Sequence, residues 1–387
     1  MAGFNPEIFR WAREGAGLGM DGAAEALQIK AESLSNVESG EAPPSRPLLL
    51  RMVKLYRRSL LTFYLPEPPR KGDRGEDFRT VIADRAIDAE AEVDALVRDL
   101  RARHSVVRST LEDDEDASPV GFIGSADMNV GVVTLSKTIQ ATLGINREEF
   151  RKQRTSELAF SMLRTRVEEA GVFVMLIGNL GSHHSAIPVE AFRGFAIADK
   201  IAPFIVINDQ DAKVAWSFTL LHELVHLWLG ATGVSGGRIE QRIERFCNAV
   251  AAEILLPQAE VADFKIAHLE FESQIAAISK QASVWSVSRP MLAYSLLRVG
   301  NISQATWQAV DEKLREMWMA ERKRAKEVSK SSESAPSYYV VRRHRLGRAM
   351  LEFASRSMHA GTLSPAKAAQ VLGVKPRSVF PLLGNAP

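Results

Sequence analysis

Two histidines and a glutamate form the most informative short pattern in the chain. His222, Glu223 and His226 lie within Phe218–Gly230, where apolar residues recur at helical spacing before a glycine ends the pattern. On a helix of about 3.6 residues per turn, His222 and His226 point the same way. Two such imidazoles can chelate one zinc ion, and Glu223, about 100° further round the helix, lies beside the metal. This HExxH pattern predicts a site in which Glu223 takes a proton from metal-bound water.

A chance match is the alternative interpretation of this pattern. The chain has only eight histidines in 387 residues, so two of them seldom fall four residues apart around a glutamate. Burying two unpaired histidines and a glutamate in an apolar helix is also costly. We therefore interpret the three residues as part of a metal site.

A third protein ligand completes a catalytic zinc site and leaves the fourth position to water. A second amphipathic helix is predicted from Ile243 to Pro257, and Glu244 lies along one edge of its apolar stripe. Glu244 is therefore the preferred third ligand. Glu240, which precedes the apolar pattern, and Glu253, on the opposite polar side, are the alternatives.

The two predicted helices together resemble a known family. The helix Phe218–Gly230, the block Glu244-x-x-Cys-Asn-x-x-Ala-Ala-x-x-Leu-Leu-Pro257 and the distance between them are similar to the ImmA/IrrE metallopeptidases, over roughly residues 145–300. These bacterial and phage proteins cut, or relieve repression by, helix-turn-helix repressors. The resemblance implies His222, His226 and Glu244 as zinc ligands and Glu223 as general base.

Cys247 departs from the family pattern, which usually has an alanine at this position. We interpret Cys247 as a small buried residue. The alternative is a redox-sensitive thiol one turn from Glu244.

Helices are predicted at Pro6–Glu14, Met20–Leu27, Ala31–Val37, Ser45–Tyr56 and Ser59–Leu65. This arrangement of the first 66 residues, with Ala23 or Ala24 in the packed second helix, resembles an Xre/Cro-type helix-turn-helix domain with Ala31–Val37 as the recognition helix. The resemblance implies Lys30, Ser33, Ser35 and Asn36 as DNA-contacting residues.

The charge of this domain also fits a second interpretation. Residues 1–45 contain three basic and seven acidic residues, whereas DNA binding depends mainly on neutralising phosphates. Gln28 also occupies the position where a turn glycine is usual. A residue with a Cβ would there have to adopt a backbone conformation that glycine adopts more readily. The alternative role is recognition of a repressor of similar fold, or dimerisation.

Three short apolar segments precede the HExxH helix and predict strands at 172–178, 194–198 and 203–208, the last two as a hairpin. We expect a small mixed or antiparallel sheet packed on that helix, with an edge strand able to pair with an extended peptide. His183 and His184 lie in a nearby loop. They are interpreted as exposed loop residues, or alternatively as a donor to the tetrahedral intermediate.

The last part of the chain has a different composition. Residues 337–387 contain eight basic residues and one acidic residue. Ser364-Pro365 predicts the start of a helix, Gly373 a turn and Pro376 the start of another helix, which is a helix-turn-helix pattern. Such a basic segment fits nucleic acid or an acidic protein partner.

The composition is compatible with several cores, since 46% of the residues are apolar. A single cysteine excludes a disulfide framework and fits a reducing cytosol. No stretch approaches the ~18 apolar residues of a membrane span, so we expect a cytoplasmic protein without a membrane partner.

These observations predict a mainly α fold with a small β-sheet (α+β). A helix-turn-helix bundle, a central zincin-like domain and a helical C-terminal region are expected. The expected boundaries are 1–66 for the first domain, 67–144 for a linker and helical connector, 145–320 for the metallopeptidase-like domain, 321–336 for a second linker and 337–387 for the basic segment.

The function implied by the resemblance is that of a zinc-dependent endopeptidase, with Mn²⁺ or Fe²⁺ as alternative metals. Its substrate would be a helix-turn-helix repressor controlling a stress, mobile-element or toxin–antitoxin operon. The competing hypothesis is a DNA-binding regulator, or an antitoxin-like protein, whose metal is structural or sensory.

Overall fold

The structure is a computed structural model that describes residues 4–69, 89–113, 118–181, 185–230, 238–331 and 337–384. The chain divides into two units, one made of residues 1–102 with 179–192 and the other of residues 103–178 with 193–387. No helix within the described ranges is both long enough and apolar enough to cross a membrane.

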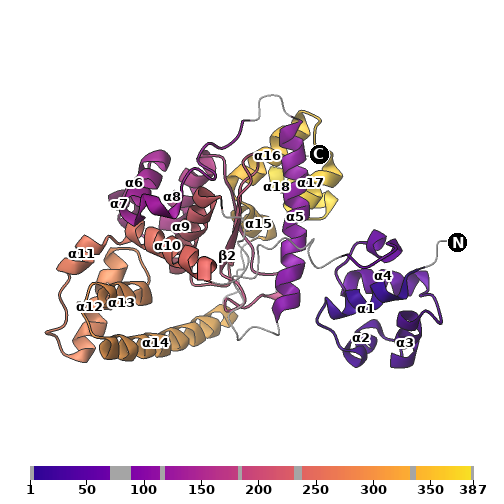
Figure 1. Cartoon of the computed structure of the whole chain (residues 1–387), viewed down its shortest axis with the longest axis horizontal. Helices are drawn as coiled ribbons and strands as arrows, with labels where there is room; N and C mark the ends of the chain where they lie inside the picture. The colour runs from indigo at the N-terminus through magenta and orange to yellow at the C-terminus, as the bar shows by residue number, and fades with distance from the viewer. Residues whose placement is uncertain are drawn as a thin grey trace. The chain divides into compact units, whose positions relative to one another are not determined.

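The N-terminal helices lie together as one group (Figure 1), and their buried apolar side chains form one core. A buried ion pair ties the first and third helices together. Arg13 donates from Nε to Oε1 of Glu38 at 2.7 Å and from Nη1 to the carbonyl of Leu18 at 2.8 Å. The elements are α1 (Pro6–Glu14), α2 (Met20–Leu27), α3 (Ala31–Ser39), α4 (Arg46–Leu55) and the 3₁₀ turn η1 (Leu60–Tyr64).

The turn between α2 and α3 has the strained backbone that its sequence predicts. Gln28 ends α2 with φ 55° and ψ 48°, in the left-handed region that glycine adopts more readily. The backbone N–H of Ile29 then bonds to the carbonyl of Ala24 at 3.0 Å. The helix-turn-helix geometry is therefore retained without the turn glycine.

The second unit contains a three-stranded mixed sheet. Strands β1 (Phe173–Leu176), β2 (Gly194–Ile197) and β3 (Phe204–Ile207) lie in the order β1-β3-β2. β1 runs parallel to β3, and β2 pairs antiparallel to β3 as the predicted hairpin requires. Each strand is an unbroken apolar run because both faces of the sheet are buried.

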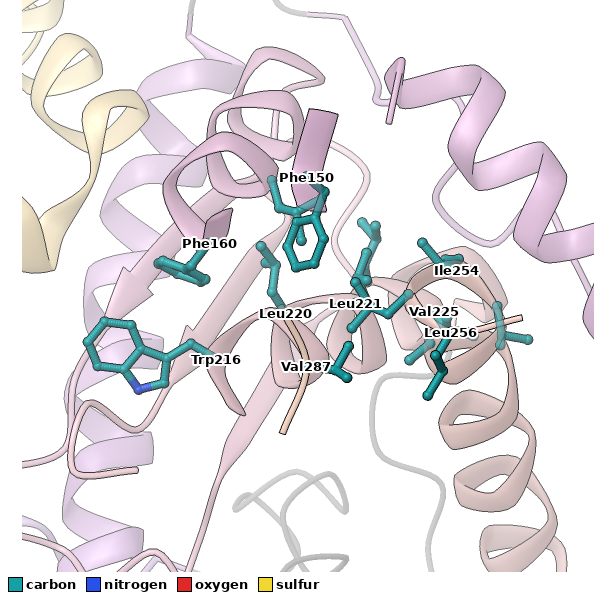
Figure 2. Close-up of a cluster of buried hydrophobic side chains, with 14 of the residues drawn as sticks. Phe150, Phe160, Trp216, Leu220, Leu221, Val225, Ile254, Leu256 and Val287 are labelled. Carbon is teal, nitrogen blue, oxygen red and sulfur yellow. The ribbon is translucent and has the colours of Figure 1, made fainter. Parts of the chain in front are cut away.

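Helices cover both faces of this sheet. On one face lie α8 (Ser156–Glu169) and α9 (Lys213–Leu229), whose apolar side chains share a core with the strands. On the other face, Phe353 of α16 (Arg348–His359) packs edge-to-face on Phe173, with ring centroids 5.8 Å apart. Figure 2 shows Trp216, Leu220, Leu221 and Val225 of α9 in the same cluster as Phe150 and Phe160.

The segment before α8 packs on the end of α9. The backbone N–H of Gly124 bonds to the carbonyl of Leu227, and that of Ala126 to the carbonyl of Trp228. Phe122 stacks on Trp228 with ring centroids 4.1 Å apart. Helix α6 (Val132–Leu143) packs on α10 (Arg238–Leu255). Part of the predicted connector 67–144 therefore contributes to the core that holds α9.

The helices after α10 also differ from the predicted boundaries. They are α11 (Gln258–Asp263), α12 (Phe271–Val284), α13 (Arg289–Arg298) and α14 (Gln304–Ser331), while the short α7 (Arg147–Arg151) precedes α8. Residues 321–331 are helical although we expected a linker over 321–336, because their Lys, Arg, Glu and Ala residues are strong helix formers. Residues 332–336 lie outside the described ranges.

The C-terminal helices form a small bundle that Arg164 joins to the sheet. The elements are α15 (Tyr338–Leu346), α16, α17 (Pro365–Leu372), η7 (Pro376–Ser378) and α18 (Val379–Leu383). The Arg164 guanidinium, buried in α8, donates to the carbonyls of Val174 in β1 and of His344 and Arg345 in α15. Glu168 pairs with Arg164 at 3.2 Å and accepts from the backbone N–H of Arg348.

Replacing Arg164 with methionine is expected to lower the free energy of unfolding by about 3–5 kcal/mol, because three carbonyls and the Glu168 carboxylate lose their buried partner. Denaturant unfolding followed by circular dichroism measures the change. The control is Arg166→Met, because Arg166 is exposed and its only described ion pair, Nη1 to Oε2 of Glu169 at 3.6 Å, lies at the surface. This change should lower the free energy of unfolding by less than about 0.5 kcal/mol. Equal effects of the two variants would contradict this role of Arg164.

Candidate metal centre

Helix α9 carries the HExxH residues, and its other residues are mostly apolar and mostly buried. It begins at Lys213, earlier than the sequence indicated, and ends at Leu229, where Gly230 caps it with φ 61°. A Cβ at Gly230 would lie 2.9 Å from the Cα of Gly124. Glycine is therefore required there both by the left-handed backbone and by the neighbouring chain.

The packing of α10 against α9 brings a carboxylate to the two histidines. The Nε2 atoms of His222 and His226 lie 3.1 Å apart. His222 Nε2 is 3.2 Å from Oε2 of Glu244, and His226 Nε2 is 3.1 Å from Oε1 of Glu244. The structure therefore brings together the three residues that the sequence pattern selects.

This donor set fits a divalent transition metal. At zinc–nitrogen distances of about 2.0–2.1 Å and tetrahedral angles, two ligand nitrogens lie about 3.3 Å apart, close to the 3.1 Å between His222 and His226. The three ligand atoms lie within 4.8 Å of one another, in the one such group found among the described residues. Nε2 is the atom of His222 that faces the other two groups, and its Nδ1 is buried with no hydrogen-bond partner among the described residues.

The Glu244 carboxylate is held ionised in this cluster. Burial raises the pKa of Glu244, but the hydrogen bonds and the charges of His222 and His226 together lower it to about 2. A carboxylate that stays charged at neutral pH is the form that binds a metal.

Glu223 lies beside the three converging groups and is buried against the sheet, with 7% of its surface exposed. Burial raises the pKa of the Glu223 carboxyl to about 7; the charge of His226 lowers it and the charge of Glu244 raises it. A carboxyl with a pKa near neutrality can both accept and return a proton, which is what general acid–base chemistry requires.

Gly194, the first residue of β2, provides the space that Glu223 occupies. A Cβ at Gly194 would lie 2.9 Å from Oε1 of Glu223 and 2.7 Å from Cγ2 of Thr219. Sequence reasoning did not select Gly194. No local sequence signal marks Gly194, because its contact with Glu223 joins β2 to a helix that begins 16 residues after the strand ends.

The alternative ligands and the unusual cysteine have other surroundings. Oε2 of Glu253 accepts a hydrogen bond from the backbone N–H of Gln258 at 3.1 Å. The side chain of Glu240 and the loop residues His183 and His184 lie outside the described parts of the structure. Cys247 is fully buried, and its burial raises the pKa of the thiol well above its usual value, which keeps the sulfur protonated.

The residues implied as DNA contacts belong to the N-terminal unit. Lys30, Ser33 and Ser35 are exposed around α3, whereas Asn36 is half-buried. The carbonyl of Asn36 accepts hydrogen bonds from the backbone of Ala42 and the Ser39 hydroxyl. Three of the four side chains thus lie on the open side of the helix.

Gly194→Ala is expected to displace Glu223 and Thr219 and to lower the free energy of unfolding by about 1–3 kcal/mol, because the added methyl group overpacks the contact. Thermal unfolding of the metal-free protein measures this change in the free energy of unfolding. Gly121→Ala is the matched control, since a Cβ at Gly121 meets nothing within 4 Å; its effect should be within about 0.5 kcal/mol. If Gly194→Ala is as stable as the control, Gly194 does not limit the position of Glu223.

Comparison with known proteins identifies two segments of the chain. Residues 178–297 match the family model of the IrrE N-terminal-like domain of peptidase M78, which indicates a metallopeptidase-type enzyme. Residues 8–61 match a helix-turn-helix domain. No curated protein and no solved structure matches the chain. The chain is therefore similar to the IrrE N-terminal-like domain of peptidase M78 over residues 178–297 and to a helix-turn-helix domain over residues 8–61.

Proposed function

We propose that the protein is a zinc-dependent endopeptidase that cleaves a helix-turn-helix transcriptional repressor in the cytoplasm. The observation that carries this proposal is the convergence of His222, His226 and Glu244 beside the buried carboxyl of Glu223. The peptidase M78 match supports the reaction class, and the helix-turn-helix match supports a role in transcription regulation.

In the proposed mechanism, His222, His226 and Glu244 would hold the metal. A bound zinc ion would lower the pKa of water toward 7 and polarise the scissile carbonyl; Mn²⁺ and Fe²⁺ accept the same donors. Glu223 takes the proton of the attacking water and delivers it to the leaving amine. Its raised pKa suits both transfers, because the proton moves to and from the same carboxyl.

The N-terminal helix-turn-helix domain is proposed to select the substrate or the site of action. Its surplus of acidic residues favours recognition of a protein of similar fold, while Lys30, Ser33, Ser35 and Asn36 are the candidate contacts if it reads DNA. Pairing of an extended peptide along β2, which begins beside Glu223, stays a prediction.

The competing candidate is a DNA-binding regulator or antitoxin-like protein without peptidase activity. The helix-turn-helix match favours the regulator, because a helix-turn-helix domain can act by binding DNA without any catalytic site. A structural or sensory metal site does not require a buried glutamate next to the ligands. The position of Glu223 therefore favours the enzyme.

Metal binding is expected to depend on the histidines of α9. Metal-depleted protein titrated with zinc should bind one equivalent, and at about 100 times the dissociation constant the ion should add about 2.7 kcal/mol to the free energy of unfolding. His226→Asn should lose both the bound metal, measured by elemental analysis, and the added stability. His268→Asn is the control, because His268 is exposed on another segment. Full zinc binding by His226→Asn would refute the assigned ligands.

Cleavage is tested by producing the chain together with the repressor encoded next to it and identifying fragments by mass spectrometry. Glu223→Gln keeps the size of the side chain but cannot accept a proton, so cleavage should slow by about 10²–10⁴-fold. Zinc content should remain that of the unaltered protein, which separates loss of the base from loss of the metal. An intact repressor with the unaltered protein would favour the regulator instead.

A further inference from the structure

The C-terminal bundle repeats the first helix and the turn of the N-terminal helix-turn-helix domain. Residues 20–33 and 365–378 align without a gap and share the pattern Ala-Ala-x-x-Leu-x-(Ile/Val)-Lys-x-x-Ser. In both copies the first helix has eight residues, and its Ala-Ala pair and Leu are buried. The family model for the helix-turn-helix domain covers only the first copy.

The two turns agree in their dihedral angles. Gly373 has φ 59° and ψ 41°, and the equivalent Gln28 has φ 55° and ψ 48°. Lys375 and Lys30, which precede the second helices, have φ −72° in both cases, with ψ 147° and 146°. The backbone N–H of Val374 bonds to the carbonyl of Ala369 at 2.9 Å, as in the N-terminal turn. Residues 365–383 therefore have the geometry of a helix-turn-helix, in which the second helix consists of the 3₁₀ turn η7 followed by α18.

Several arginines of this bundle have structural partners and do not form a binding surface. Nη2 of Arg342 donates to the carbonyls of Leu372 and Gly373, at the end of α17. Arg343 donates in the same way to the carbonyls of Pro381 and Leu382 in α18. Arg345 pairs with Asp209 and Arg348 with Glu352. Half of the eight basic residues thus complete helix ends or ion pairs.

The remaining basic side chains surround the helix-turn-helix. Lys367 is exposed on α17, and Lys375 and Arg377 are exposed at the start of the second helix. Arg356 is exposed on α16. These four side chains make no ion pair within the described part of the chain.

The two copies differ in charge at equivalent exposed positions. The C-terminal copy has Lys367, Gln370 and Arg377 where the N-terminal copy has Gly22, Glu25 and Glu32. These positions lie on the first helix and at the start of the second, which in helix-turn-helix proteins contact the DNA backbone and the base edges. Glutamates there repel phosphates, whereas lysine and arginine neutralise them.

We propose that residues 337–384 are a second helix-turn-helix unit and that duplex DNA binds to the face formed by Lys367, Gln370, Lys375, Arg377 and Ser378. The unit is fixed to the sheet through Arg164, so DNA bound to this face is held at one position relative to the α9 site. The proposal does not depend on peptidase activity.

The full chain is tested for binding to a fluorescein-labelled random-sequence duplex by anisotropy over a range of salt concentrations. The variant Lys375→Ala/Arg377→Ala should bind at least about tenfold more weakly near 50 mM salt, and the slope of log affinity against log salt should fall by about 1.8, because each phosphate contact contributes about 0.9. Lys375→Arg/Arg377→Lys should keep the slope of the unaltered chain.

The matched control is Lys152→Ala/Arg154→Ala, which removes an exposed lysine and an exposed arginine at the same spacing away from this face and should stay within about twofold of the unaltered affinity. Circular dichroism confirms that each variant is folded. The proposal is overturned if the unaltered chain does not bind duplex at low salt, if Lys375→Ala/Arg377→Ala keeps the affinity and slope of the unaltered chain, or if the Lys152/Arg154 control loses as much affinity as that variant.

Discussion

The packing of α10 on α9 is the contact on which the candidate site depends. Helical periodicity aligns His222 and His226, but only the second helix brings the Glu244 carboxylate within 3.2 Å of both imidazoles. The partners of α9 in turn hold it in place. α6 packs on α10, the backbone at Gly124 closes the end of α9, and the sheet supports the face that carries Glu223. The donors are therefore positioned by a rigid core and not by loops.

The sheet also determines the chemical character of Glu223. Contact with β2 at Gly194 removes water from the carboxyl, so its pKa lies near neutrality while that of Glu244 is held far below. Two carboxylates on neighbouring helices thus acquire different protonation behaviour from their surroundings alone. Such a division suits one group to binding a cation and the other to moving a proton.

Sequence reasoning located the parts of the site that local periodicity controls. The spacing of His222 and His226 and the position of Glu244 beside an apolar stripe are properties of single helices. The role of Gly194 was missed because it arises from a contact between distant segments. A count of charges likewise could not distinguish Arg342 and Arg343, which complete helix ends, from Lys375 and Arg377, which are exposed. The helix over 321–331 was missed because charged, serine-containing stretches occur in helices as well as in linkers.

The C-terminal helices, which Arg164 joins to the sheet, cover β1, and this has a consequence for shortened forms of the protein. The carbonyl of Val174 that it binds belongs to the outer strand β1, and α15 and α16 pack on that strand. Truncation after residue 336 would remove α15 and α16 and so expose Phe173 and the unpaired edge of β1. An exposed strand edge is a template for intermolecular β-pairing. Fragments ending there are therefore prone to aggregate, even though they retain every group of the α9 site.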